Sequence, residues 1–206
     1  MPDTPKHEVQ RGAGAARNLL FLREEELRLA QDLLYFGYRD FTAGADRILA
    51  TLEMGRAHHR VLHFVGRAPG IKVGELLAIL DITKQSLGRV LQPLIEKGYV
   101  RQAPGPNDKR QRLLTLTEQG EALEKRLFAA QREWVLRAYR EAGPQAVEGF
   151  RQVMRGLMGN DARAQFEALE RAEAPGRTTP AFAPNPAPRT EPRPRVAEPA
   201  ERGDDP

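Results

Sequence analysis

The chain of 206 residues carries 32 Lys and Arg against 28 Asp and Glu, a formal net charge of +4, and it contains no cysteine. The lack of cysteine excludes disulfides, thiolate zinc sites, cysteine nucleophiles and thiol redox sensors. The longest apolar runs, such as residues 76–80, are far shorter than the roughly 18 residues of a membrane span. Residues 1–17 lack the apolar core of a signal peptide. We therefore expect a soluble cytoplasmic protein.

The two ends of the chain differ in composition from its middle. Nine of the sixteen prolines lie in residues 172–206, where Phe182 and Val196 are the only large apolar residues. Such a segment buries too little apolar surface to offset the entropy of ordering it, which predicts a disordered Pro-rich tail. Residues 1–18 predict a flexible N-terminus. One domain is expected at about 19–160, followed by a short helix at 161–171.

Apolar side chains in the middle of the chain recur at the three- and four-residue spacing of helices. Thr83 has the side chain of a helix N-cap, and Gly143-Pro144 is a helix breaker. Pro93 falls inside an expected helix, where we expect it to bend the helix after Arg89 at a cost of about 3 kcal/mol. The sequence predicts helices at 22–41, 44–52, 56–65, 73–80, 84–97, 117–141 and 145–158.

The pattern changes to short strand-like runs at 99–102 and 112–117, which flank a turn-rich, basic loop. These runs predict a β-hairpin with a long tip. A helix, a tight turn, a second helix and then a hairpin is the order of a winged helix-turn-helix. The expected fold class is therefore mostly α with a small β-hairpin wing. The winged helix-turn-helix is expected at about 56–117, with further helices on both sides.

Positive charge is concentrated in the second of these helices and in the hairpin. Residues 84–112 contain seven cations and two anions, a net charge of +5, so the remainder of the chain carries −1. A polyanion bound to this stretch would gain Coulomb attraction and release counterions. The alternative, a basic loop that is merely solvated, stays open on charge alone.

Several strings in this region form a recognisable set: residues 73–80, 83–91, 94–100, 106–112 and 114–120. Together they resemble the MarR family of bacterial transcriptional regulators, with a similarity that covers about residues 20–160. Residues 55–60 add a resemblance to the PetP-type members of that family.

The resemblance implies a homodimer in which the first helix and the last two helices of each subunit intertwine. Residues 22–52 and 118–158 carry the apolar stripes that such an interface needs. A twofold dimer presents two recognition helices, so we expect it to read a pseudopalindrome with half-sites about one helical turn apart.

The first turns of the expected recognition helix hold the candidate base-reading residues. Lys84, Gln85 and Ser86 would reach base edges in the major groove, where a glutamine can pair bidentately with adenine. Arg89, about one turn later, would reach a guanine or a phosphate. Thr83 would cap the helix and touch a backbone phosphate.

The expected hairpin tip holds the candidate minor-groove residues. Arg110 resembles the family arginine that enters the minor groove, where A·T-rich stretches concentrate negative potential. By the same resemblance Asp108 braces that arginine rather than contacting DNA. Lys109 and Arg112 are expected to contact phosphates.

Two further groups of residues allow more than one interpretation. His59 and His63 have the spacing of two metal ligands on a helix, but ordinary packing is the favoured interpretation and we expect no metal. The second group could line a cleft for a small aromatic ligand, although packing in the core is the simpler explanation. It comprises Tyr35, Phe36, Tyr38 and Phe41.

No catalytic motif is found, neither a nucleophile elbow nor a phosphate-binding glycine loop, and no cofactor is expected. The predicted function is therefore that of a sequence-specific DNA-binding regulator rather than an enzyme. The competing function is a non-specific winged-helix nucleoid protein or a protein-interaction module.

Overall fold

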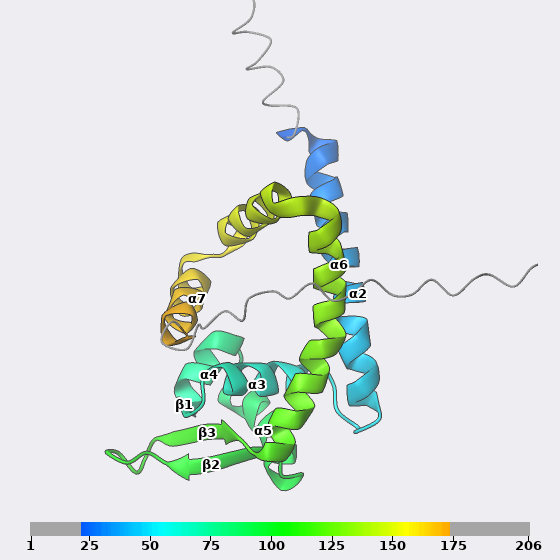
Figure 1. Ribbon diagram of the computed structural model, residues 1–206. Coiled ribbons are helices and arrows are strands. Elements are labelled where there is room, and N and C mark those ends of the chain that lie inside the picture. Colours follow the sequence, from blue (N-terminus) through cyan, green and yellow to red (C-terminus); the bar gives the residue numbers. More distant parts are fainter. Residues whose placement is uncertain (1–21, 174–206) are drawn as a thin grey trace, which may run out of the picture. The chain divides into compact units, whose positions relative to one another are not determined.

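The structure is a computed structural model that describes residues 22–173. The flexible N-terminus expected at 1–18 and the tail beyond residue 173 lie outside the described residues. Two long helices lie side by side, and a smaller lobe of short helices and strands packs at one end of them (Figure 1). The elements are α2 (Glu24–Ala50), α3 (Arg56–Arg67), β1 (Ile71–Lys72), α4 (Val73–Leu80), α5 (Lys84–Glu96), β2 (Val100–Pro104), β3 (Arg112–Leu116), α6 (Glu118–Leu157) and α7 (Asn160–Glu173).

The first long helix is continuous, so the prediction of two helices at 22–41 and 44–52 is wrong. Gly44 lies within α2, buried against α6, and a Cβ at Gly44 would lie 3.4 Å from the Cβ of Ala130. The Thr42 hydroxyl donates back to the carbonyls of Tyr38 and Arg39. Close packing on α6 therefore overrides the low helix propensity of glycine that suggested a break.

The lobe contains α3, α4, α5 and an antiparallel sheet of strand order β1-β3-β2. The expected hairpin is confirmed, with Val100 opposite Leu116 and Pro104 opposite Arg112. Strand β1 was not predicted, because two residues are too few to show a strand period. The mostly α fold class with a small wing is confirmed. Fully buried side chains of the core include Leu49, Val61, Leu62, Val65, Leu76, Leu94, Leu114 and Leu127.

The second long helix is bent where the sequence predicts a break. Gly143 has φ 79° and ψ 169°, and Pro144 opens the next helical stretch. Beyond the bend the chain turns back, and α7 lies near α4 (Figure 1). Along residues 22–173 no helix is long and apolar enough to cross a membrane.

The lobe is joined to α6 at a short, tightly packed junction. The Thr117 side chain caps α6 by accepting from the Gly120 N–H at 3.1 Å, and its hydroxyl donates to the carbonyl of Gly98 at 2.6 Å. The Thr117 N–H donates to the carbonyl of Tyr99 at 3.1 Å. A Cβ at Gly120 would overlap that same carbonyl. Thus the end of α5, the start of β2 and the start of α6 meet at one point.

We expect Gly120→Ala to lower the free energy of unfolding by about 3 kcal/mol, because the new methyl group would meet the rigid Tyr99 backbone. Gly149→Ala is the matched control, since Gly149 is an exposed glycine of α6 with open space around it. An alanine there should instead stabilise the helix by about 0.5–1 kcal/mol. Urea unfolding of both variants measures the difference, and equal stabilities would contradict the close approach.

Candidate nucleic-acid interface

Helix α5 has one buried face and one exposed face. Leu87, Leu91 and Leu94 recur at helical spacing and are buried in the lobe. The residues that the sequence assigned to base reading lie in the first two turns of α5 and are exposed. They are Lys84, Gln85, Ser86 and Arg89.

The start of α5 is capped as expected. The Thr83 hydroxyl accepts from the Ser86 N–H at 3.2 Å and donates to the Ser86 hydroxyl at 3.0 Å. Asp81, in the left-handed conformation with φ 49°, ends α4 and allows the tight turn. The positive end of the α5 dipole is therefore exposed together with two polar side chains, an arrangement that favours a phosphate.

Helix α5 continues through Pro93 to Glu96 without interruption. Proline has no N–H to donate to the carbonyl of Arg89, four residues earlier. Leu91 and Leu94 are buried on either side of Pro93, so packing holds this part of the helix in place. The exposed residues at 84–89 all precede the proline, and the helix continues past it, as expected. The bend expected after Arg89 stays a prediction.

The hairpin tip is closed by hydrogen bonds within residues 105–111. The Gly105 N–H donates to the carbonyl of Gln111, and the Gln111 N–H donates to the carbonyl of Asp108, both at 3.0 Å. The Asp108 carboxylate accepts from the main-chain N–H of Arg110 at 2.9 Å. The Asp108 carboxylate thus holds the backbone of Arg110 in place. The position of this backbone sets the direction in which the Arg110 side chain leaves the tip.

The cations of the wing are exposed. Lys109 and Arg110 lie in the tip, and Arg112 begins β3 opposite Pro104. The hairpin projects from the rest of the lobe (Figure 1). The structure therefore places the wing residues and the exposed face of α5 on the same lobe.

One cation of the basic stretch has protein partners, although its side chain is 42% exposed. The Lys97 ammonium group donates to the carbonyl of Leu52 at 2.8 Å and lies 3.7 Å from the Glu53 carboxylate. Lys97 thereby ties the end of α5 to the connection between α2 and α3. The charge count over residues 84–112 included this lysine in the surface that would bind a polyanion. Its position at the end of the helix was the only feature of the sequence that favoured a contact with the protein instead.

The histidines of α3 lie beside α6. Burial lowers the pKa of His59, and the nearby His63 has a smaller effect in the same direction. His63 Nδ1 lies 3.8 Å from the Glu124 carboxylate. Among residues 22–173 no group of three or more His, Asp or Glu side chains is arranged to hold a metal ion.

His58 has a capping role that the sequence did not reveal. Its Nδ1 accepts from the Gly55 N–H at 3.1 Å at the start of α3. Burial lowers the pKa of His58; a backbone hydrogen bond at Gly55 acts against this, and the neighbouring Lys97 acts in the same direction as burial. Because Nδ1 accepts the Gly55 N–H, it carries no proton in this arrangement.

We expect acidification to destabilise the fold partly through His58. Its pKa is lowered in the folded state, so its contribution is present above the unfolded value of about 6.5 and is lost as the pH falls below it. Glutamine can accept the same N–H and does not titrate. His58→Gln should therefore lose less stability than the wild type between pH 7.5 and pH 5 in urea unfolding. Parallel pH profiles would contradict this role.

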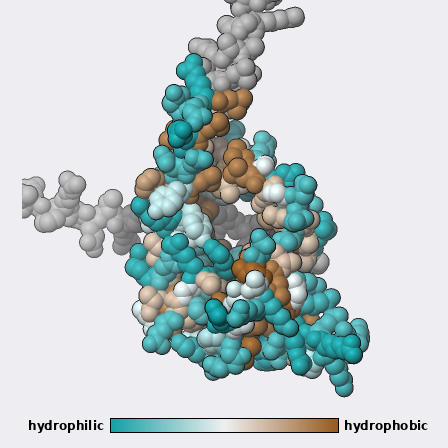
Figure 2. Space-filling model, turned by 180° about the vertical axis from the view of Figure 1, so that it is seen from behind, coloured by the Kyte–Doolittle hydropathy of each residue, from teal (hydrophilic) through white to brown (hydrophobic). Residues whose placement is uncertain are grey.

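Most of the aromatic side chains of α2 do not pack in the core of the chain. Core packing, the simpler explanation offered by the sequence, is therefore wrong for three of the four. Tyr35, Phe36 and Tyr38 are 65%, 50% and 47% exposed, whereas Phe41 is half-buried. Hydrophobic surface is visible along the projecting helices in Figure 2. The exposed apolar residues of α2 and α6 include Leu27, Leu29, Leu33, Leu34, Phe128, Trp134, Phe150, Val153 and Leu157.

Comparison with known proteins gives consistent matches. The model of the MarR family matches residues 52–111. The HTH-type transcriptional regulator PetP of Rhodobacter capsulatus is 49% identical over 162 residues, which cover 79% of this chain and 98% of the relative. A crystal structure of MarR is similar with a TM-score of 0.53 and 25% identity, over 69% of this chain and 93% of that one. A structure of a mutant MarR from Escherichia coli complexed with operator DNA is similar with a TM-score of 0.53 and 23% identity. The match covers 68% of this chain and 99% of that one.

Proposed function

Because the chain belongs to the MarR family of transcriptional regulators, we propose that it binds a pseudopalindromic operator as a homodimer. Its relatives are regulators and not enzymes, as the sequence predicted. The observation that carries the proposal is the lobe itself, where a capped helix exposes polar side chains and a closed hairpin tip exposes cations. A nucleic acid is the partner that this combination of helix and wing fits best.

In this proposal the two parts of the lobe read different grooves. Lys84, Gln85 and Ser86 contact base edges in the major groove, and Arg89 contacts a guanine or a phosphate. The Thr83 hydroxyl is engaged in capping, so it positions the helix and contacts at most a phosphate.

Arg110 enters the minor groove, and Asp108 sets the backbone that carries it. Lys109 and Arg112 contact phosphates.

The homodimer is supported by the apolar surface that the protomer leaves uncovered. The first half of α2 and both halves of α6 expose leucine and aromatic side chains that a soluble monomer would bury. A second copy of the chain, placed by a twofold axis, would cover these faces and pair two lobes. The cytoplasm is the compartment in which such a dimer would meet its operator.

A small aromatic ligand is the proposed modulator, held near Tyr38. The Arg56 guanidinium lies 5.7 Å from the centre of the Tyr38 ring, and Arg60 donates to the Tyr38 hydroxyl at 3.4 Å. An aromatic ring with an acidic group would find both a stacking partner and cations at this place. Operator binding measured with and without candidate phenols tests this modulation.

We expect Gln85→Ala and Arg110→Ala each to weaken operator binding by about 1–3 kcal/mol, with a much smaller effect on random DNA. Lys109→Ala should weaken binding to both DNAs similarly and reduce the salt slope by about one, because it contacts only a phosphate. Fluorescence anisotropy over a series of salt concentrations measures all three. Equal behaviour of the variants on both DNAs would contradict base reading.

Genome-wide footprinting of the wild type separates the regulator from the competing function. A few sharp peaks over pseudopalindromes support a sequence-specific regulator. Broad, salt-sensitive coverage would indicate a nucleoid protein, and absence of DNA binding would indicate a protein-interaction module.

We expect Leu33→Lys to shift the protein from dimer to monomer in analytical ultracentrifugation. Leu33 is 65% exposed in the protomer, and burying a leucine contributes about 1.5–3 kcal/mol at each of two symmetric positions. Gln31→Lys adds the same charge at an exposed polar position of α2 and is the control. An unchanged sedimentation coefficient for Leu33→Lys would place the interface elsewhere.

A further inference from the structure

The last described helix contacts the first helix of the helix-turn-helix. The side-chain amide of Gln165, on α7, donates to the main-chain carbonyl of Ala78 at 3.0 Å. Ala78 lies in the last turn of α4, and its carbonyl also accepts from the Asp81 N–H at 3.3 Å. The contact therefore lies directly before the turn that leads into the recognition helix.

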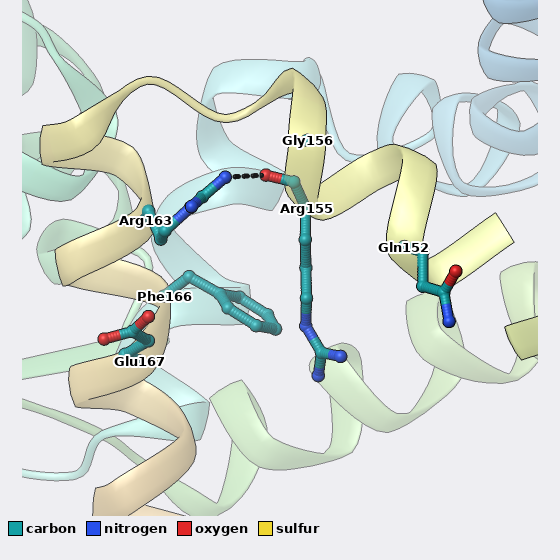
Figure 3. A pocket seen from close by; sticks show the side chains of 6 residues that line it. All are labelled: Gln152, Arg155, Gly156, Arg163, Phe166 and Glu167. Atoms are coloured by element: carbon teal, nitrogen blue, oxygen red, sulfur yellow. Dashed lines mark hydrogen bonds between the residues drawn. The ribbon is translucent and has the colours of Figure 1, made fainter. Parts of the chain in front are cut away.

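Helix α7 is also attached to the second half of α6. The Arg163 guanidinium donates to the carbonyl of Arg155 at 2.7 Å, and the Arg155 guanidinium lies 3.8 Å from the Glu170 carboxylate. The Phe166 ring points toward the Arg155 side chain across a cavity of about 370 Å³ (Figure 3). Contacts on two sides thus hold α7 between α6 and α4.

We propose that α7 is a strap that positions the DNA-binding lobe, with Gln165 as its positioning residue. The proposal rests on the proposed operator binding. The lobe is already fixed to α6 at the Thr117–Gly120 junction, which lies at the far end of the recognition helix from Ala78. Lys97, Arg56 and His63 add contacts between the lobe and the long helices or the turn that follows α2. The contact of Gln165 is an additional attachment, made at α4, and it restricts movement of α4 and of the turn into α5 relative to α6.

This restriction matters for DNA binding because both recognition helices must meet their half-sites at a fixed spacing. Any residual movement of α4 and α5 is lost on binding, and that loss lowers the affinity. A strap that restricts the lobe before DNA arrives reduces this cost without any contact to the DNA.

The first test compares Gln165→Ala with Gln152→Ala in the full chain. Gln152 has the same side chain and lies on the α6 side of the cavity in Figure 3. We expect Gln165→Ala to weaken operator binding about 2–5-fold, the effect of one solvent-accessible hydrogen bond. The salt slope should not change because no phosphate contact is lost. Gln152→Ala should bind as the wild type does, and equal affinity of the two variants would overturn the proposal.

The second test uses the lack of cysteine in the chain. The double variant Ala78→Cys with Gln165→Cys is joined by a short bis-maleimide. We expect the cross-linked protein to bind operator at least as tightly as the wild type. A loss of binding on cross-linking would show that α7 must leave α4 before DNA binds, which overturns the proposed positioning role.

Hydrogen exchange of the free protein separates this proposal from the failure of operator binding. Amides at residues 81–86 should exchange faster in Gln165→Ala than in Gln152→Ala, whatever the protein binds. Unchanged exchange would overturn the strap. Faster exchange in a protein that binds no operator would retain the strap and reject the proposed function.

Discussion

The close approach of the first turn of α6 to the Tyr99 carbonyl is the constraint on which the rest of the structure depends. Only a residue without a side chain fits at Gly120, and the Thr117 hydroxyl satisfies both the helix start and the carbonyl of Gly98. Helix α5 ends at this point and strand β2 begins there. The two elements that we propose to contact DNA, α5 and the hairpin, are therefore anchored together at the start of α6.

The parts of the fold with strong local signals could be predicted from the sequence. The cap at Thr83 and the break at Gly143-Pro144 each depend on residues within a few positions of one another. The hairpin joins two strands that are consecutive in the chain, with Pro104 opposite Arg112 next to the tip. Features decided by distant partners could not be predicted. Gly44 stays helical because Ala130 packs on it, and β1 exists because β3 lies beside it.

The candidate site shows the same division. Exposure of Gln85 and Arg110 follows from the helical spacing and from the turn-rich loop, both of which are local. The inward contact of Lys97 depends on Leu52, 45 positions away, and charge counting could not anticipate it. Likewise Tyr35, Phe36 and Tyr38 of α2 are exposed because no other part of residues 22–173 covers them. Sequence patterning identifies apolar faces, but it does not say which surface covers each one.

The backbone at Gly143 sets the direction of the second half of α6. Its φ and ψ fall in a region that only glycine occupies without strain, so one residue sets the angle between the two halves of α6. The arm from Pro144 to Leu157 is roughly 21 Å long at 1.5 Å per residue. A tilt of about 20° at this pivot would move its tip by about 7 Å, more than twice the length of a hydrogen bond. A small change in one dihedral angle at Gly143 would thus displace the end of α6, and with it α7, which contacts α4.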